Sequence, residues 1–337
     1  MKGRLIKMLK SKIMCAAMAV ILSFTCFGCT GTKSDKTKIT IALDWTPNTN
    51  HTGIYVAKEL GFFEDAGIEI EIIEALESGA EAVVAGGTAQ FGISFQDYLV
   101  PAFSAKEEER LPITAIAAII QHNTSGIISP KELNITSPKD LKGHTYATWE
   151  LPIEQAIIKQ VMSNDGASFN DVLLIPQYVE NLQGAFESGI DSVWIYYGWD
   201  GINAELNNID TNFFYFKDYG KELDYYSPVI IANNDYITQN EKLTKDFLSA
   251  IKKGYEYCVD NPEKAAKILV DANEGMDLTL CTESQKWLAD KYIDDANEWG
   301  VIEANRWNSF FDWVHENGLC EEKIPQNYGF TNQYLVD

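Results

Sequence analysis

Arginine is scarce in this chain of 337 residues, in which it occurs only as Arg4, Arg110 and Arg306. Lysine and arginine together number 27 against 49 aspartates and glutamates, so the formal charge is −22. A chain this acidic is poorly suited to contact phosphates, and we expect it to bind no nucleic acid. Because sulfonates and phosphates are usually held by arginine, the scarcity also favours a neutral or cationic small-molecule ligand.

The familiar sequence patterns of catalysis are missing as well. The chain contains no HExxH, GxSxG, Walker A or GxGxxG pattern, and its four histidines do not combine with cysteines at zinc spacing. Beyond the N-terminal region the cysteines are Cys258, Cys281 and Cys320, which cannot all pair and have no metal-binding spacing. We therefore expect no enzymatic activity, no metal and no cofactor.

The N-terminal region has the composition of a secretory signal peptide. Basic residues are followed by an apolar run that is shorter than the roughly 20 residues of a spanning helix. The run ends in Cys26-Phe-Gly-Cys29, which is similar to a bacterial lipobox with Cys29 as the lipid-bearing residue, although Cys26 stands where leucine is usual. We expect a signal peptide at 1–28, a lipid-anchored tether at 29–38 and a location outside the cytoplasm on the cell membrane. Ordinary secretion is the alternative.

The rest of the chain alternates short apolar segments with helical periodicity, which predicts an α/β fold. A first unit contains four predicted strands, at 38–43, 68–73, 91–94 and 113–120. The strand–helix order of this unit predicts a parallel sheet with helices on both faces. A second unit contains four more predicted strands, at 144–148, 172–176, 192–196 and 212–217. A late strand at 228–232 and a helical tail follow.

Two such units in series predict two lobes with a ligand cleft between them, because strand ends and helix N-termini converge there. We expect lobe 1 to comprise 39–121 plus 229–337 and lobe 2 to comprise 126–224. The chain would then cross between the lobes near 121–126 and 225–229. Hinge closure about these crossings could bury a ligand.

Aromatic, amide and acidic side chains gather where the predicted strands end. Rings stack on tryptophan or tyrosine, and exocyclic amines donate to carboxylates, so this mixture suits a flat heteroaromatic ligand. The residues that we expect at the ligand are Asp44, Trp45, Asn48, Ser94, Gln96, Trp149, Glu154, Trp194, Tyr196, Tyr197, Asp200 and Tyr225. Among them Trp45, Trp194 and Tyr197 would wall the ring. Asp200 would accept from an amine, with Glu154 and Asp44 as further candidates. Asn48, Ser94 and Gln96 would serve the remaining polar edges. The alternative for any single aromatic residue is packing in the core, and for Glu154 or Asp200 it is a favourable position at a helix N-terminus.

Five motifs resemble the branch of ABC-importer substrate-binding proteins that binds pyrimidine precursors of thiamine. They are Leu43–Ala57 (LDWTPNTNHTGIYVA), Phe91–Gln96 (FGISFQ), Ile119–Gly126 (IIQHNTSG), Trp194–Ile202 (WIYYGWDGI) and Leu223–Ile231 (LDYYSPVII). The similarity extends over about residues 38–335. It implies a two-lobed periplasmic-binding-protein-like fold of type II and a monomer. It also implies a formylaminopyrimidine or hydroxymethylpyrimidine ligand and a membrane permease as the partner.

Two alternatives stay open beside that assignment. The cargo could be riboflavin, a purine-like ring or a sulfonate. The chain also resembles the fungal thiamine-pyrimidine synthase, which uses a lysine-bound pyridoxal phosphate and consumes its own histidine. The positions of that lysine and histidine are occupied here by Ser94 and Tyr98, and the segment 223–229 lacks the cysteines of the synthase. Synthase activity is therefore disfavoured.

Overall fold

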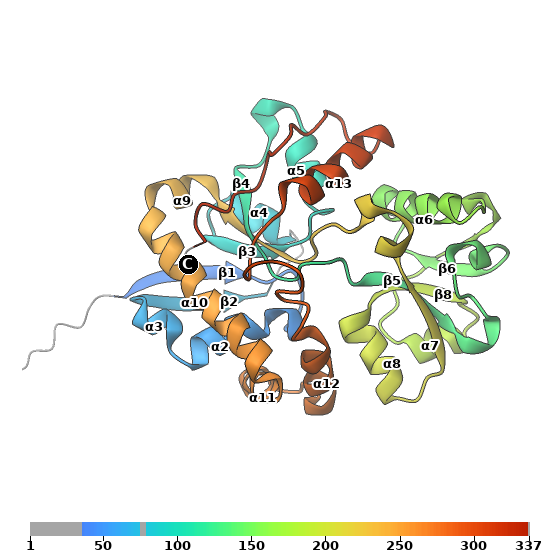
Figure 1. Ribbon diagram of the computed structural model, residues 1–337, viewed down its shortest axis with the longest axis horizontal. Coiled ribbons are helices and arrows are strands. Elements are labelled where there is room, and N and C mark those ends of the chain that lie inside the picture. The colour runs from blue at the N-terminus through green and yellow to red at the C-terminus, as the bar shows by residue number, and fades with distance from the viewer. Residues whose placement is uncertain (1–35, 75–78, 336–337) are drawn as a thin grey trace, which may run out of the picture. The chain divides into compact units, whose positions relative to one another are not determined.

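The computed structural model describes residues 36–74 and 79–335. The predicted signal peptide at 1–28, Cys29 and most of the predicted tether lie outside the described residues. Among the helices of the described part, none is both long and apolar enough to cross a membrane. Two five-stranded sheets organise this part of the chain, each with helices packed on it (Figure 1).

The first sheet has the strand order β2-β1-β3-β10-β4. Its strands are β1 (Thr37–Ala42), β2 (Ile68–Ile73), β3 (Phe91–Ser94), β4 (Ile113–Ala118) and β10 (Val229–Asn233). β1 runs parallel to β2 and β3, whereas β10 runs antiparallel to both of its neighbours. The four strands of the first predicted unit therefore run in one direction, as predicted, and the late strand β10 is inserted antiparallel between β3 and β4. The chain leaves this sheet at the C-terminal end of β4 and re-enters it at the same end of the strands, between β3 and β4, so β10 runs in the opposite direction.

The second sheet has the strand order β7-β6-β8-β5-β9. Its strands are β5 (Ser125–Pro130), β6 (Thr145–Thr148), β7 (Leu173–Pro176), β8 (Ser192–Tyr196) and β9 (Thr211–Tyr215). β5 was not among the predicted strands, and it pairs antiparallel with β8 and β9. Gly126 permits this pairing, because a Cβ there would lie 2.0 Å from the carbonyl oxygen of Phe214.

Helices cover both sheets. We call the first sheet with its helices lobe 1, and the second sheet with its helices lobe 2. Lobe 1 carries α2 (Thr52–Glu59), α3 (Phe62–Asp65), α4 (Gly79–Ala85), α5 (Val100–Ser104), α9 (Asn234–Gln239), α10 (Glu241–Asp260), α11 (Pro262–Ala272), α12 (Leu278–Leu288) and α13 (Ala304–Glu316). Lobe 2 carries α6 (Pro152–Asn164), α7 (Leu182–Glu187) and α8 (Ile202–Leu206). Local sequence explains several helix starts: α6 and α11 begin at proline, and the Asp277 side chain caps α12.

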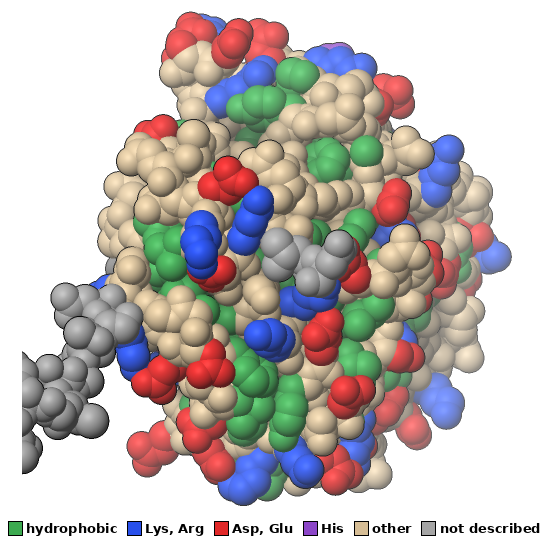
Figure 2. All heavy atoms as spheres, turned by 60° about the vertical axis from the view of Figure 1, so that its left-hand side comes forward, with side chains coloured by type: hydrophobic (Ala, Val, Ile, Leu, Met, Phe, Trp, Pro, Cys, Tyr) green, Lys and Arg blue, Asp and Glu red, His purple; other side chains and the backbone are tan. Residues whose placement is uncertain are grey.

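Lobe 1 contains the larger apolar interior, in which α2 and α10 pack on the sheet through residues such as Ile54, Phe247 and Tyr255. The thiols of Cys258 and Cys281 are free and buried there. The outer surface is different in character. Its acidic and basic side chains are intermingled on the face shown in Figure 2. Pairs such as Lys242–Asp246 on α10 join neighbouring turns of exposed helix.

Candidate functional site

The loop after β1 is folded on its own polar side chains. Asn48 accepts a backbone N–H at 2.9 Å and caps the short helix η1 (Thr49–His51). The buried His51 accepts the Asn48 amide N–H through Nδ1 at 3.2 Å, so its Nε2 donates to Asp44 at 2.7 Å. Asp44 and Asn48 therefore hold the loop that presents Trp45, whose side chain is 54% exposed.

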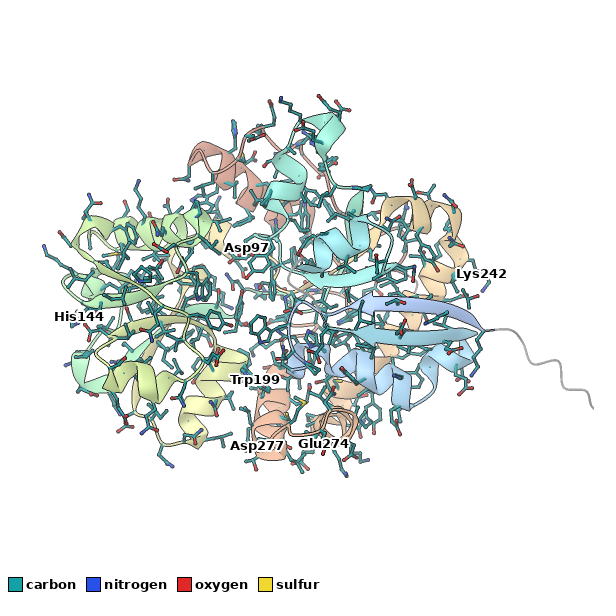
Figure 3. All side chains as sticks on the ribbon, turned by 180° about the vertical axis from the view of Figure 1, so that it is seen from behind. Asp97, His144, Trp199, Lys242, Glu274 and Asp277 are labelled. Atoms are coloured by element: carbon teal, nitrogen blue, oxygen red, sulfur yellow. The ribbon has the colours of Figure 1, made fainter. Side chains whose placement is uncertain are left out.

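A second group of acids lies in this region: Glu81 comes from α4, and Asp97 comes from the segment after β3. The Ser94 hydroxyl donates to Glu81 on α4. Burial raises the pKa of Glu81; the bond from Ser94 opposes that rise, and the charge of Asp44 adds to it. Asp97 is only 7% exposed, and its Oδ1 has no hydrogen-bond partner among the described residues. Burial raises the pKa of Asp97 to about 7. Figure 3 shows Asp97 on the side of lobe 1 that faces lobe 2.

Aromatic rings from the two lobes meet beside these acids. Trp45 lies 6.0 Å, centroid to centroid, from Tyr178, which follows β7 of lobe 2. Phe95 of lobe 1 stacks on Tyr196 at the end of β8, with centroids 5.7 Å apart and an interplanar angle of 29°. Tyr98 packs edge-on against Phe95 at 5.2 Å and is 47% exposed. The site therefore has exposed ring faces close to buried carboxyl groups.

Asp200 adds a carboxyl group from lobe 2. It lies in η6 (Tyr197–Gly201), a π-helical turn that directly follows β8. Such turns are frequent at functional sites. Burial raises the pKa of Asp200 to about 6; burial also raises the pKa of Tyr178, to which the charges of Glu180 and Asp200 add. We call the whole set the aromatic–acid cluster: Asp44, Trp45, Glu81, Phe95, Asp97, Tyr98, Tyr178, Tyr196 and Asp200.

Two predicted ligand residues use their polar atoms inside the protein instead. Gln96 donates to the Trp307 carbonyl at 2.8 Å and accepts the Tyr226 amide N–H at 3.0 Å. Glu154 accepts from the Tyr146 hydroxyl at 2.6 Å and from the backbone amide that follows β6 at 3.0 Å. Both side chains are at most 1% exposed. The structure therefore gives them structural roles and does not support ligand contact.

Three further predicted aromatic residues pack against other rings, although Tyr225 among them lies close enough to Asp97 for the carboxylate charge to act on its hydroxyl group. Trp194 is 4% exposed, and its ring centroid is 4.3 Å from that of Phe216. Tyr225 is fully buried with its ring 4.3 Å from Phe310. Tyr197 packs against the aromatic side chains of β9. Each fills an interior or an outer face of the fold, so the structure does not place Trp194 or Tyr197 as ring walls. The half-buried Trp149 packs on Trp194 at 5.6 Å.

Conversely, sequence reasoning did not select Glu81, Phe95, Asp97, Tyr98 or Tyr178. Asp97 had a usable signal, because it is an acid only a few residues beyond a strand that is entirely apolar or small. Glu81 and Tyr178 had none, since only the packing of separate segments brings them to the site.

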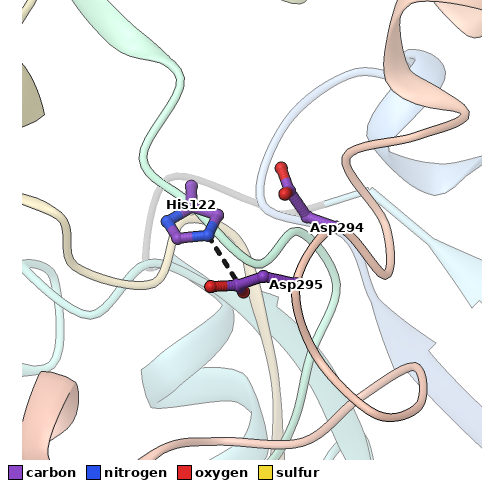
Figure 4. Close-up of side chains that lie close together, drawn as sticks. All are labelled: His122, Asp294 and Asp295. Atoms are coloured by element: carbon purple, nitrogen blue, oxygen red, sulfur yellow. Dashed lines mark hydrogen bonds and ion pairs between the residues drawn. The ribbon is translucent and has the colours of Figure 1, made fainter.

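A further group of ionisable side chains lies where the chain crosses between the lobes. Single ligand atoms of His122, Asp294 and Asp295 lie within 4.8 Å of one another (Figure 4). Both ring nitrogens of His122 are already bonded, Nδ1 to Asp224 at 2.6 Å and Nε2 to Asp295 at 3.1 Å. The hydrogen bond to Asp224 raises the pKa of His122. Arg306 stands 3.8 Å from Asp224. These contacts describe an ion-pair network rather than a metal site.

Comparison with protein families decides the classification. A family model described as NMT1/THI5 like matches residues 48–265. The chain belongs to the NMT1/THI5-like family. It is 25% identical to the formylaminopyrimidine-binding protein of Halalkalibacterium halodurans over 95% of this chain and 98% of that protein. It is 24% identical to a 4-amino-5-hydroxymethyl-2-methylpyrimidine phosphate synthase of Legionella pneumophila over 90% of this chain and 93% of the synthase. Proteins similar to this chain therefore include both a binding protein and a synthase.

The fold agrees with the prediction of a two-lobed binding protein. The periplasmic aliphatic sulphonate binding protein of Escherichia coli superposes with a TM-score of 0.66 at 17% identity, covering 88% of this chain and 99% of that structure. At this identity the similarity shows the shared two-lobed α/β architecture.

Proposed function

We propose that this protein is the extracytoplasmic substrate-binding component of an ABC importer and that it carries a thiamine-precursor aminopyrimidine, formylaminopyrimidine or hydroxymethylpyrimidine. The observation that carries the proposal is the pair of ring contacts that cross between the lobes beside buried carboxyl groups, Trp45 with Tyr178 and Phe95 with Tyr196. A flat ring can stack on these faces while its exocyclic amine donates to a carboxylate. The binding protein of Halalkalibacterium halodurans supports the same class of cargo.

The residues of the site favour binding over synthesis. The fungal synthase needs a lysine to hold its cofactor and a histidine to consume, and the corresponding positions hold Ser94 and Tyr98 here. Ser94 is fully buried and bonded to Glu81, and no serine can form the imine that lysine forms. These residues do not fit the cofactor, and we propose a protein that releases its ligand unchanged.

The remaining parts of the proposal concern delivery. A lipid on Cys29 would anchor a monomer to the outer face of the cell membrane. Closure of the lobes would then present the loaded protein to a permease. A sulfonate cargo is the second candidate, because the Escherichia coli protein of the same fold binds one. It is less favoured, since Arg110 and Arg306 contact Tyr328 and Tyr226 rather than the cluster.

Titration calorimetry with formylaminopyrimidine, hydroxymethylpyrimidine, riboflavin and an alkanesulfonate tests the proposal directly. We expect heat only with the two pyrimidines. Trp45→Ala should weaken their binding roughly tenfold, because it removes about 1.4 kcal/mol of stacking and burial. Leu60→Ala, which truncates another exposed apolar side chain of lobe 1, is the control and should bind normally. No heat and no thermal shift with either pyrimidine at millimolar concentration would remove the assignment.

A further inference from the structure

The carboxyl groups of the half-buried Glu81 and the buried Asp97, both in the aromatic–acid cluster, lie near enough for their charges to interact, and neither has a basic partner among the described residues. Asp44 accepts a hydrogen bond from Nε2 of His51. Within residues 36–74 and 79–335, by contrast, no ion pair joins Glu81 or Asp97 to a lysine or arginine. Glu81 has the hydroxyl of Ser94, whereas Oδ1 of Asp97 has no hydrogen-bond partner among those residues. A carboxyl oxygen that is buried without a partner costs free energy, and a ligand donor would recover it.

The groups around Asp97 are acids and phenols. Burial is the main cause of the raised pKa values of Asp97 and Tyr98; the charge of Glu81 adds to the first shift and the charge of Asp97 to the second. Burial also raises the pKa values of Tyr196 and Tyr225, and the charge of Asp97 adds to both shifts. The charge of Glu81 would oppose an anion, and the ring faces of Tyr98 and Tyr196 would attract a cation.

We propose, on the basis of the function proposed above, that the site selects a cationic heterocycle, with a primary ammonium group of the ligand directed at Asp97 and Glu81. An ammonium group offers three donors and no acceptor, which matches the unpartnered carboxyl oxygen. A formylated amine is neutral, has a single N–H to donate, and brings a carbonyl oxygen that the ionised carboxylate of Asp97 would repel. The free aminomethyl form of the pyrimidine is therefore the preferred cargo.

A change of protonation should accompany this selection. Because the pKa of Asp97 is about 7 in the empty site, a substantial fraction of its carboxyl groups carry a proton at neutral pH. An arriving ammonium group favours the carboxylate, so the O–H bond of Asp97 breaks and the proton goes to the solvent. Asp44 already has a hydrogen bond to His51, so the release is expected from Asp97.

The test is calorimetry at pH 7 with formylaminopyrimidine and with the same pyrimidine lacking its formyl group. Each titration is repeated in two buffers of different ionisation enthalpy, which reports protons released per ligand. We expect the free amine to bind at least tenfold more tightly and with proton release. Asp97→Asn should abolish both the preference and most of the release. Asp235→Asn, which neutralises an exposed carboxyl group on α9, should change neither.

The outcomes separate this inference from the proposed function. If formylaminopyrimidine binds as tightly as the free amine or more tightly, the cation inference falls and the proposed function stands. If neither pyrimidine binds, both fall. Retention of the full preference by Asp97→Asn would also overturn the inference. Should that variant not fold, Glu81→Gln must reduce the preference, since it removes the second carboxylate from the same site.

Discussion

At the scale of single residues, two glycines decide how closely α2 and α10 approach. A Cβ at Gly254 would lie 2.0 Å from the carbonyl oxygen of Gly53, and a Cβ at Gly53 would lie 2.5 Å from the ring of Tyr255. Neither neighbour can move freely, since one is backbone and the other is a fully buried ring. The helix contact behind the Trp45 loop therefore depends on the absence of side chains at both positions.

Gly254→Ala should lower the free energy of unfolding by about 1–3 kcal/mol, because overpacking outweighs the better helix propensity of alanine. Urea denaturation measures the change. Lys253→Ala, which alters the exposed neighbouring position of α10, should have little effect. Equal or greater stability of Gly254→Ala would show that the two helices can separate without cost.

At the scale of elements, α12 of lobe 1 is fastened to the π-helical turn η6 of lobe 2. The fully buried hydroxyl of Ser284 bonds to the Gly198 carbonyl and lies 2.6 Å from the Thr49 hydroxyl. Thr49 belongs to the loop that presents Trp45, and Gly198 to the turn that contains Asp200. One hydroxyl thus joins the loop of one lobe to the turn of the other.

Ser284→Ala should speed ligand dissociation roughly tenfold, because it leaves two buried oxygen atoms without their partner at a cost of about 1–3 kcal/mol. Stopped-flow tryptophan fluorescence with a bound pyrimidine gives the dissociation rate. Thr279→Ala removes an exposed hydroxyl from the same helix and serves as the control. An unchanged rate for Ser284→Ala would mean that α12 does not hold the lobes together around the ligand.

The elements also show what sequence reasoning can reach. Strands such as β1 and β8 were predicted because runs of apolar residues record local burial. The antiparallel insertion of β10 and the missed strand β5 depend on pairing between distant segments, which no local pattern contains. The same limit explains which residues of the site could be predicted from the sequence. Trp45 and Asp200 stood out in their own motifs, whereas Tyr178 and Glu81 reach the cluster only through tertiary packing.

At the scale of the whole molecule, three titrating groups make folding depend on pH: the buried Asp97 and the half-buried Asp200 and His122. Because the pKa values of Asp97 and Asp200 are about 7 and about 6 when folded, against about 3.9 when unfolded, the folded protein binds more protons between those values. Its stability must then fall as the pH rises from about 4 to 7. His122 acts in the same direction, since its raised pKa gives a contribution that is lost as the pH rises through the folded value.

The free energy of unfolding of the empty protein should therefore be lower at pH 8 than at pH 5, which urea titrations at several pH values can measure. The pKa of Asp224 is lowered, so its titration changes the stability only at more acidic pH and does not affect the comparison between pH 5 and pH 8. Asp97→Asn should flatten the dependence by a few kcal/mol, because each pKa unit corresponds to about 1.4 kcal/mol. Asp235→Asn should leave the slope unchanged. If the pH dependence of the free energy of unfolding persists in Asp97→Asn, then Asp97 is already ionised in the protein without ligand. Ligand binding could not then release a proton from it.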